Sequence, residues 1–306
     1  MREIVFGPVR SRRLGLSLGV DLLVPKTCSF DCLYCEIGPT TQKTIERKCW
    51  RPTEEIQKAL EVRLSDPTLH FEVLTFAGSG EPTLHQDLGK ILKFAQKLTD
   101  RPICILTNSS LVFRTDVQRD LCAFDIVLPS LDAAIQETFL RLNRPVPGLK
   151  IEDIIHGLKM LREKMTGQMW LEIMLVGGIN DNAQDLEALV KAVEYIKPHR
   201  VQLNTVARPP AYPEAKAIAL ETLQGLCDLF TPKAEVIYYK DQKENQYRRV
   251  SSEEIITLLT HRPCPSEEIA QALGYDYKDT LLVLQQLVQT GKVKTKIYQK
   301  RVFYYA

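Results

Sequence analysis

The sequence predicts an α/β fold in which a parallel sheet of about six strand–helix units is followed by a small C-terminal domain. Through residue 239, short apolar segments alternate with segments whose apolar residues recur at helical spacing. Such alternation implies parallel strands joined by right-handed crossovers. The composition then shifts, because residues 240–250 are polar and charged, whereas residues 251–306 contain new helical patterns. We therefore expect a main domain at 1–239, a linker at 240–250 and a second domain at 251–306.

The strands and helices of the main domain follow one another in a regular order. The first strand is expected near residues 15–25, and the first helix opens at Thr53. Polar residues follow several of the later strands, which is where parallel sheets place their ligands. The remaining strands are predicted at 71–77, 102–109, 125–132, 171–176 and 200–206, and the remaining helices at 87–97, 151–164 and 183–197.

Composition predicts a protein of the cytoplasm. The chain has 306 residues, enough for one large and one small domain, and 40 basic against 38 acidic residues leave a net charge of +2. This balance does not by itself indicate a nucleic-acid partner. The sequence has no apolar run of the ~18 residues that a membrane span needs, and its N-terminus lacks the pattern of a signal peptide. Eight cysteines without such a signal favour a reducing compartment.

Three cysteines, Cys28, Cys32 and Cys35, lie within one short stretch. A closed zinc site requires four ligands, and the usual iron–sulfur cluster is bound by four thiolates. Three thiolates at this spacing predict a 4Fe–4S cluster in which one iron has no protein ligand. The alternatives are three unrelated thiols, or a zinc site completed by a distant His or Asp. The other five are dispersed, which gives no sign of a second cluster, and Cys104 is expected in the core: Cys49, Cys104, Cys122, Cys227 and Cys264.

A glycine-rich turn follows the predicted strand at 71–77. It consists of Gly78, Ser79, Gly80, Glu81 and Pro82. Glycines let main-chain groups approach a ligand closely, Pro82 stiffens the exit, and Glu81 supplies an acceptor or an anchor for the turn. Taken without the cysteines, the same segment would be an ordinary strand-to-helix turn.

The cysteine triplet, with Tyr34 directly before the third cysteine, resembles the signature of the radical S-adenosylmethionine (SAM) superfamily. The resemblance implies a partial (β/α)6 TIM-type barrel and one 4Fe–4S cluster whose open iron is chelated by SAM. It also implies reductive cleavage of SAM to methionine and a 5′-deoxyadenosyl radical, with electrons from an external reductant such as ferredoxin or flavodoxin. The protein would then be an oxidoreductase or transferase.

The same resemblance implies a set of SAM-binding residues. Residues 78–82 are similar to the Gly-Gly-Glu-Pro motif of the family, which binds the SAM amino group, with Ser79 in place of a glycine. The strand at 102–109 is similar to one that ends near the ribose, and a serine after the next strand often reaches SAM. The implied SAM-binding residues are Tyr34, near the adenine, and Gly78, Ser79, Gly80, Glu81, Pro82, Thr107, Asn108 and Ser130.

The C-terminal segment predicts three short helices and a hairpin, and resembles a winged helix-turn-helix. The third helix is less suited to nucleic acid, because Asp276 and Asp279 offset Lys278 near its start. Such modules bind nucleic acid or dock proteins, and both remain open. Phosphate contact is suggested by the basic residues of the hairpin, namely Lys292, Lys294, Lys296, Lys300 and Arg301.

Residues 6–15 and 204–210 resemble a group of archaeal and anaerobic-bacterial iron–sulfur oxidoreductases related to the wyosine-forming tRNA enzymes. The first hypothesis for the function is radical modification of a macromolecule, RNA or tRNA, with residues 251–306 holding the nucleic acid. The alternative is a maturase or activase that modifies a protein or peptide. A third hypothesis, an iron–sulfur transcriptional sensor, is disfavoured because a sensor needs no SAM motif. Four arginines suit either an anionic substrate or acidic partners within the fold: Arg10, Arg12, Arg13 and Arg208.

Overall fold

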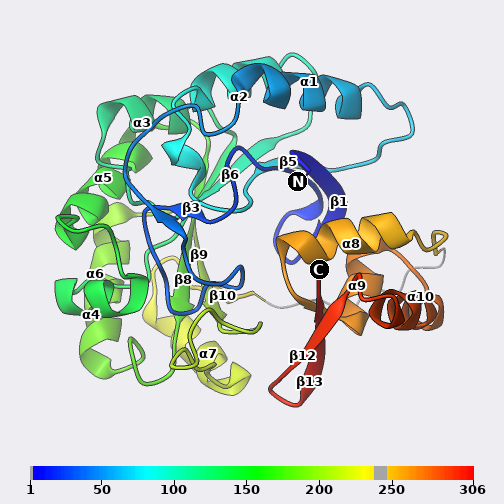
Figure 1. Ribbon diagram of the computed structural model, residues 1–306. Coiled ribbons are helices and arrows are strands. Elements are labelled where there is room, and N and C mark those ends of the chain that lie inside the picture. Colours follow the sequence, from blue (N-terminus) through cyan, green and yellow to red (C-terminus); the bar gives the residue numbers. More distant parts are fainter. Residues whose placement is uncertain (1–2, 238–246) are drawn as a thin grey trace.

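The computed structural model describes residues 3–237 and 247–306, and its main feature is one eight-stranded sheet (Figure 1). The strand order is β1-β2-β5-β6-β7-β8-β9-β10. All neighbouring strands from β2 onward pair in parallel, whereas β1 pairs antiparallel with β2. The strands are β1 (Val5–Ser11), β2 (Gly15–Val20), β5 (Val73–Phe76), β6 (Ile103–Thr107), β7 (Ile126–Pro129), β8 (Gln168–Leu175), β9 (Arg200–Thr205) and β10 (Glu235–Val236).

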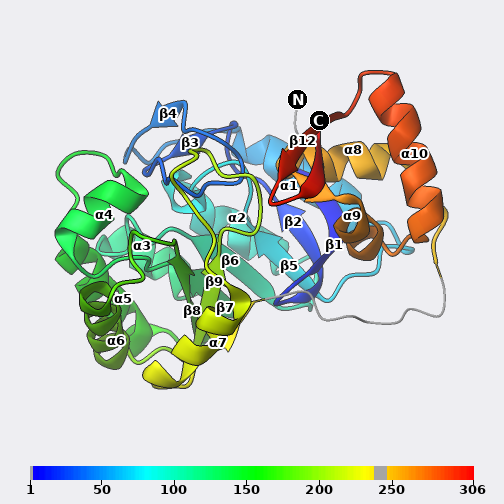
Figure 2. The ribbon, with the colours of Figure 1, turned by 90° about the horizontal axis from the view of Figure 1, so that it is seen from below.

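Helices cover the outer side of this sheet, as Figures 1 and 2 show. The six parallel strands β2, β5, β6, β7, β8 and β9 confirm the expected α/β architecture of a partial barrel. The helices are α1 (Thr53–Leu64), α2 (Leu88–Ala95), α3 (Thr115–Leu121), α4 (Gln136–Asn143), α5 (Ile151–Lys164), α6 (Ala183–Ile196) and α7 (Leu220–Leu226).

Five of these strands and helices were not predicted, namely β1, α3, α4, α7 and the short β10. The segment of β1 contains Pro8, which lacks the N–H that a ladder needs. The structure accommodates it because β1 is an edge strand whose register with β2 shifts between Phe6 and Val9. The helices α3 and α4 have 7 and 8 residues and contain only two and three apolar residues, so their helical period is weak.

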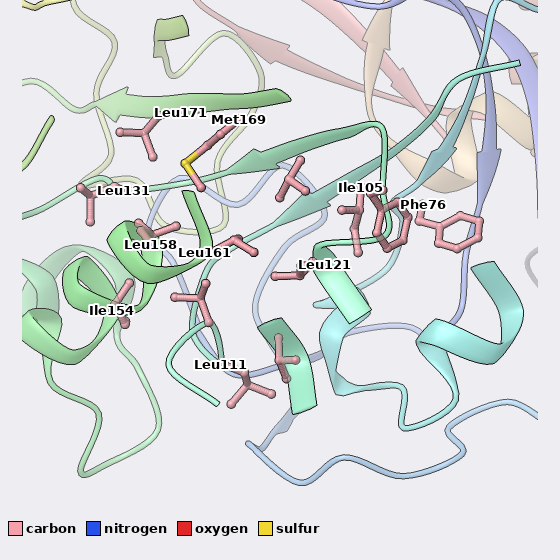
Figure 3. Packing of buried hydrophobic residues seen from close by; sticks show 14 of the residues in the cluster. Phe76, Ile105, Leu111, Leu121, Leu131, Ile154, Leu158, Leu161, Met169 and Leu171 are labelled. Atoms are coloured by element: carbon pink, nitrogen blue, oxygen red, sulfur yellow. The ribbon is translucent and has the colours of Figure 1, made fainter. Parts of the chain in front are cut away.

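The hydrophobic core lies between the sheet and its helices. In Figure 3, Phe76, Ile105 and Met169 from the strands face Leu121 of α3 and Leu158 of α5. All five side chains are buried. The strand residues point outward to the helices at alternate positions, which leaves the other face of each strand for the inside of the barrel.

The N-terminal end of the barrel interior is filled by the turn between β1 and β2. Leu14 of this turn packs against a small cluster made of Val73, Cys104, Leu128 and Trp170. Cys104 is fully buried there, which confirms the expectation that it is a core residue. With one end of the interior closed, ligands can reach the barrel from the C-terminal ends of the strands, where parallel sheets place their sites.

The C-terminal segment forms three helices and a small antiparallel sheet of order β11-β13-β12, beside β1 (Figures 1 and 2). Its own core includes Ile255, Ile269 and Leu284. The elements are α8 (Ser252–His261), β11 (Cys264–Pro265), α9 (Ser266–Leu273), α10 (Tyr277–Gln289), β12 (Lys294–Tyr298) and β13 (Arg301–Tyr305). The linker expected at 240–250 lies mostly outside the described residues. In the described ranges, no helix is both long and apolar enough for a membrane span.

Asp276 has a structural role that the charge argument overlooked. Its side chain accepts hydrogen bonds from the backbone N–H groups of Lys278 and Asp279, so it is the N-cap of α10. N-capping aspartates satisfy the free donors at a helix start. The acidic start of α10 therefore follows from helix capping and says nothing about nucleic acid.

Candidate functional site

The three cysteines lie on a loop at the C-terminal ends of the parallel strands. This segment, residues 27–44, is called the cysteine loop below. It begins with β3 (Thr27–Cys28), which pairs with β4 (Gln42–Lys43). Backbone hydrogen bonds fix it to α4: the N–H of Asp31 donates to the Asn143 carbonyl at 3.0 Å, and that of Leu33 to the Leu142 carbonyl at 3.0 Å.

Each cysteine sulfur has its own side-chain N–H donor. Asn108 Nδ2 lies 3.4 Å from Cys28 Sγ, and Asn143 Nδ2 lies 3.5 Å from Cys32 Sγ. Lys26 Nζ lies 3.2 Å from Cys35 Sγ. Donors of this kind stabilise thiolates, and hydrogen bonds to sulfur are a standard feature of iron–sulfur sites. The donor set therefore fits a cluster bound by these three residues.

Burial keeps the thiols of Cys28 and Cys32 protonated unless a metal replaces their protons. It raises the pKa of Cys28 to about 12 and raises the pKa of Cys32 well above its ordinary value. Metal binding would therefore release protons from this loop. Within residues 3–237 and 247–306, no three His, Cys, Asp or Glu side chains are arranged to hold one metal ion. A zinc site would need such a convergence, whereas the ligands of a cluster bind separate irons.

The glycine-rich turn packs directly under the cysteine loop. A Cβ atom at Gly80 would lie 1.7 Å from the carbonyl oxygen of Thr27, so only glycine fits there. A Cβ atom at Gly78 would lie 2.4 Å from Cγ of Asp21. Ser79 donates its hydroxyl to the same Asp21 carboxylate. Both glycines thus allow close approach of the protein's own chain, a requirement distinct from the ligand contact that the sequence suggested.

Glu81 is an anchor for the neighbouring strand. Its carboxylate accepts hydrogen bonds from Thr107 Oγ1 at 2.6 Å and from the N–H of Asn108 at 2.6 Å. It also accepts the hydroxyl and N–H of Thr83. Burial raises the pKa of Glu81, and these four donors oppose the shift. Pro82 begins a 3-10 turn (Pro82–Leu84) that carries the chain away from the site.

The turn after β6 is fixed by the same anchor. Thr107 is buried, and its hydroxyl is engaged by Glu81. Asn108 directs its side chain toward the cysteine loop, where it donates to Ser29 Oγ at 2.9 Å as well as to Cys28. Ser130 follows β7, and its N–H donates to the Thr107 carbonyl at 2.9 Å. The structure therefore brings Thr107, Asn108 and Ser130 together with residues 78–82.

A buried acid, Asp132, was missed by the sequence analysis as a site residue. It accepts hydrogen bonds from the hydroxyl of Tyr34, from Asn143 Nδ2 at 2.8 Å and from the N–H of Met174 at 3.0 Å. Burial raises the pKa of Asp132 to about 6 despite these donors. The sequence feature that could have identified Asp132 is its position two residues after Ser130. Asn143 lies at the end of a helix that was not predicted, and no sequence feature identified it as a site residue.

The arginines favour acidic partners within the fold. Arg13 Nη1 lies 2.8 Å from Glu172 Oε2 inside the barrel. Burial tends to raise the pKa of Glu172, but Arg13 holds it below its usual value. Arg208 pairs with Glu36, one residue after Cys35, and with Glu268 of α9. For these two arginines the structure supports an ion-pairing role.

The C-terminal hairpin reaches the open end of the barrel. Tyr298 of β12 packs against an apolar group, called the mouth cluster below, of Leu33, Leu142, Val176, Ile179, Val206 and Ala215. Beside it, a cavity of about 360 Å³ is lined by residues 36–39 of the cysteine loop, by Pro209 and by Arg262 and Lys296. A larger cavity of about 690 Å³ lies between β1, α1 and α8, and no cysteine-loop residue lines it.

Comparisons with known proteins agree with this site. A model of the radical SAM superfamily matches residues 22–193, more than half of the chain. The chain is 36% identical over 298 residues to a protein named GTPase Obg of Brachyspira hyodysenteriae, covering 96% of this chain but 44% of that protein. It thus spans less than half of that relative's length.

Two further matches cover a larger share of the matched protein's own length. The chain is 32% identical over 310 residues to a UPF0026 protein of Methanocaldococcus jannaschii, covering 98% of this chain and 95% of that protein. The crystal structure of a radical SAM methyltransferase from Sphaerobacter thermophilus matches with a TM-score of 0.54 at 16% identity, covering 72% of this chain and 65% of that one. This likeness concerns the fold. The chain belongs to the radical SAM superfamily.

Proposed function

We propose that Cys28, Cys32 and Cys35 bind the cluster and that the turn of residues 78–82 binds SAM with Thr107, Asn108 and Ser130. The N–H donors at the three sulfurs support the first assignment. The convergence of the strand ends around Glu81 supports the second. Held by these residues, the cluster would supply the electron that cleaves SAM, and an external reductant would restore that electron. The protein orients SAM and excludes water, while the cofactors carry the chemistry.

The substrate that this geometry fits best is an RNA strand. The supporting observation is the placement of the hairpin: Lys294, Lys296 and Tyr298 alternate along β12 and so share one face. On that face Tyr298 packs on the mouth cluster, and Lys296 lines the cavity beside the cysteine loop. A phosphate backbone bound by Lys296 and Arg262 would present a nucleotide to the open end of the barrel.

The C-terminal segment is proposed to be a winged helix that holds this RNA. Its order, helix, strand, two helices and hairpin, supports that assignment, as do the exposed Lys292, Lys294 and Lys300. A link to the wyosine-forming tRNA enzymes remains a hypothesis about the substrate, and the M. jannaschii relative is described only as a UPF0026 protein.

Binding of total tRNA to the full chain, measured against salt, tests the proposal. Affinity is expected to fall steeply with salt, and Lys296→Ala should reduce the slope of the log–log plot by roughly 0.7. The control is Lys191→Ala, because Lys191 lies on α6 and pairs with Glu187. Binding that is absent at low ionic strength, or independent of salt, would count against an RNA substrate.

A protein substrate is the second candidate, and one observation favours it. Ile297 and Val302 face each other across the hairpin, on the face opposite Lys296, and are 74% and 44% exposed. Exposed apolar pairs suit a protein partner better than a phosphate backbone. If Ile297→Ser abolishes turnover of a protein substrate while Lys296→Ala leaves it unchanged, the hairpin is a docking element for protein.

A further inference from the structure

Three side chains from three separate segments each direct an N–H group at a different cysteine of the triplet. Lys26 precedes β3, Asn108 follows β6, and Asn143 ends α4. The nitrogen-to-sulfur distances are 3.2 Å for Lys26 and Cys35, 3.4 Å for Asn108 and Cys28, and 3.5 Å for Asn143 and Cys32. No sulfur shares its donor with another.

The orientation of Asn108 is set by its neighbours. Its Oδ1 accepts the backbone N–H of Ser110 at 2.9 Å. A backbone N–H can only donate, so the oxygen end of this amide faces Ser110 and the NH₂ end faces the sulfur. The second N–H donates to Ser29 Oγ at 2.9 Å, and this serine hydroxyl contacts Ser110. Asn108 is therefore held by groups on both sides of the loop.

Asn143 is oriented by a carboxylate. Its Nδ2 donates to Asp132 Oδ2 at 2.8 Å, and a carboxylate accepts, so the NH₂ end lies on this side. The remaining N–H faces Cys32 Sγ and the Tyr34 hydroxyl, each at 3.5 Å. Asp132 is itself fixed by Tyr34 and by the N–H of Met174. Its role toward Cys32 is thus to position Asn143.

Lys26 brings a full positive charge to the third sulfur. Its backbone is in the left-handed region, with φ of 62°, and its N–H donates to the Ser79 carbonyl at 2.8 Å. The main chain at Lys26 is therefore tied to the SAM-binding turn, and the ammonium group extends to Cys35. Hydrogen bonds from ionised donors are about twice as strong as those between neutral groups.

These contacts have a consequence for the reduced state of the cluster. An electron added to a 4Fe–4S cluster increases the negative charge on its sulfur ligands, and N–H donors stabilise that charge. We propose that Lys26, Asn108 and Asn143 set the reduction potential of the cluster, one donor to each thiolate, with Lys26 contributing most through its charge. The inference rests on Cys28, Cys32 and Cys35 being the cluster ligands.

The test compares Lys26→Met with Lys43→Met. Both variants remove one lysine from the same part of the chain, but Lys43 donates to the Arg144 carbonyl at 3.2 Å and to no sulfur. Iron and sulfide per chain are measured first, and the cluster is then titrated anaerobically by electron paramagnetic resonance. Lys26→Met should be about tenfold harder to reduce, a midpoint about 59 mV more negative for one electron. In Lys26→Arg, the midpoint potential should return most of the way to the wild-type value.

Asn143→Leu provides a second, uncharged test, with a smaller shift expected in the same direction. An unshifted midpoint in fully loaded Lys26→Met would overturn the inference. A shift no larger than that of Lys43→Met would do so too, since it would report net charge alone. The titration needs no substrate, so failure of RNA binding leaves it unaffected. A wild-type chain that assembles no cluster would instead refute the ligand assignment.

Discussion

Arg208 Nη1 lies 2.6 Å from Glu36 Oε2, one residue beyond the last cysteine of the triplet. The Arg208 side chain is only 4% exposed, and its second nitrogen contacts Glu268 of α9. Burial tends to raise the pKa of Glu36, but Arg208, together with Arg262 and Arg12, lowers it. One guanidinium in the loop after β9 therefore joins the cysteine loop to the C-terminal segment.

Replacing Arg208 should loosen that connection. Arg208→Met leaves two carboxylates without this partner. We expect the free energy of unfolding to fall by about 2–3 kcal/mol. The loss is less than for a fully buried pair because Glu36 reaches solvent. Amide hydrogen exchange in residues 251–306 and in the cysteine loop should then be up to about a hundredfold faster. Arg301→Met is the control, because Arg301 pairs with Glu267 at an exposed site. Equal exchange in both variants would contradict a coupling role.

The cluster should depend on three cysteines only. Cys28→Ala, Cys32→Ala or Cys35→Ala is expected to abolish the oxygen-labile cluster, because each removes one of three thiolates and the loop has no substitute. Cys49→Ala and Cys227→Ala should bind as much iron and sulfide as wild type. Iron and sulfide analysis after anaerobic reconstitution provides the measurement. Two clusters per wild-type chain would refute the single-site model.

Gly80→Ala should destabilise the site. The new methyl group would lie 1.7 Å from the Thr27 carbonyl, so the cysteine loop must move. Overpacking of this kind costs about 1–3 kcal/mol or more, and SAM cleavage should fall with it. Gly225→Ala is a matched control, because Gly225 lies in α7 and a Cβ there meets nothing within 4 Å. That variant should be about 0.5–1 kcal/mol more stable in urea denaturation. Similar losses in both would exclude the proposed clash.

His85 should make stability depend on pH. It is buried, accepts the N–H of Asp87 at Nδ1, and has Nε2 at 3.0 Å from the Arg51 carbonyl. The acceptor role of Nδ1 requires a neutral ring, and burial lowers the pKa of His85. The unfolded chain therefore takes up the proton first, so stability falls as pH drops below about 6.5, by up to about 1.4 kcal/mol per pH unit.

The measurement is urea denaturation between pH 7 and 5. His85→Gln retains a donor for Arg51 and an acceptor for Asp87 but cannot titrate, so its stability should decline less over this interval. His70→Gln removes an exposed histidine and serves as the control. If both variants decline as steeply as wild type, His85 is not the group responsible.

Local sequence patterns were enough for most of the elements. The strands β5, β6, β7, β8 and β9 are apolar runs with polar ends, and the helices α2, α5 and α6 have a clear helical period. The three helices and the hairpin of residues 251–306 were likewise predicted from local patterns. Such features depend on residues within one or two turns of each other.

By itself, the sequence indicated the cofactors: the cysteine triplet and the glycine-rich turn resemble the motifs of the radical SAM superfamily, and each lies within one short segment. The tertiary structure alone decided which distant residues serve them. Tyr34 and Asp132 are 98 positions apart, Cys32 and Asn143 111, and Glu36 and Arg208 172. Contact between the two residues of each pair depends on the order and register of the strands and on where α4 ends. No local pattern encodes those distances, because they are fixed only when the sheet assembles and its loops converge at one edge.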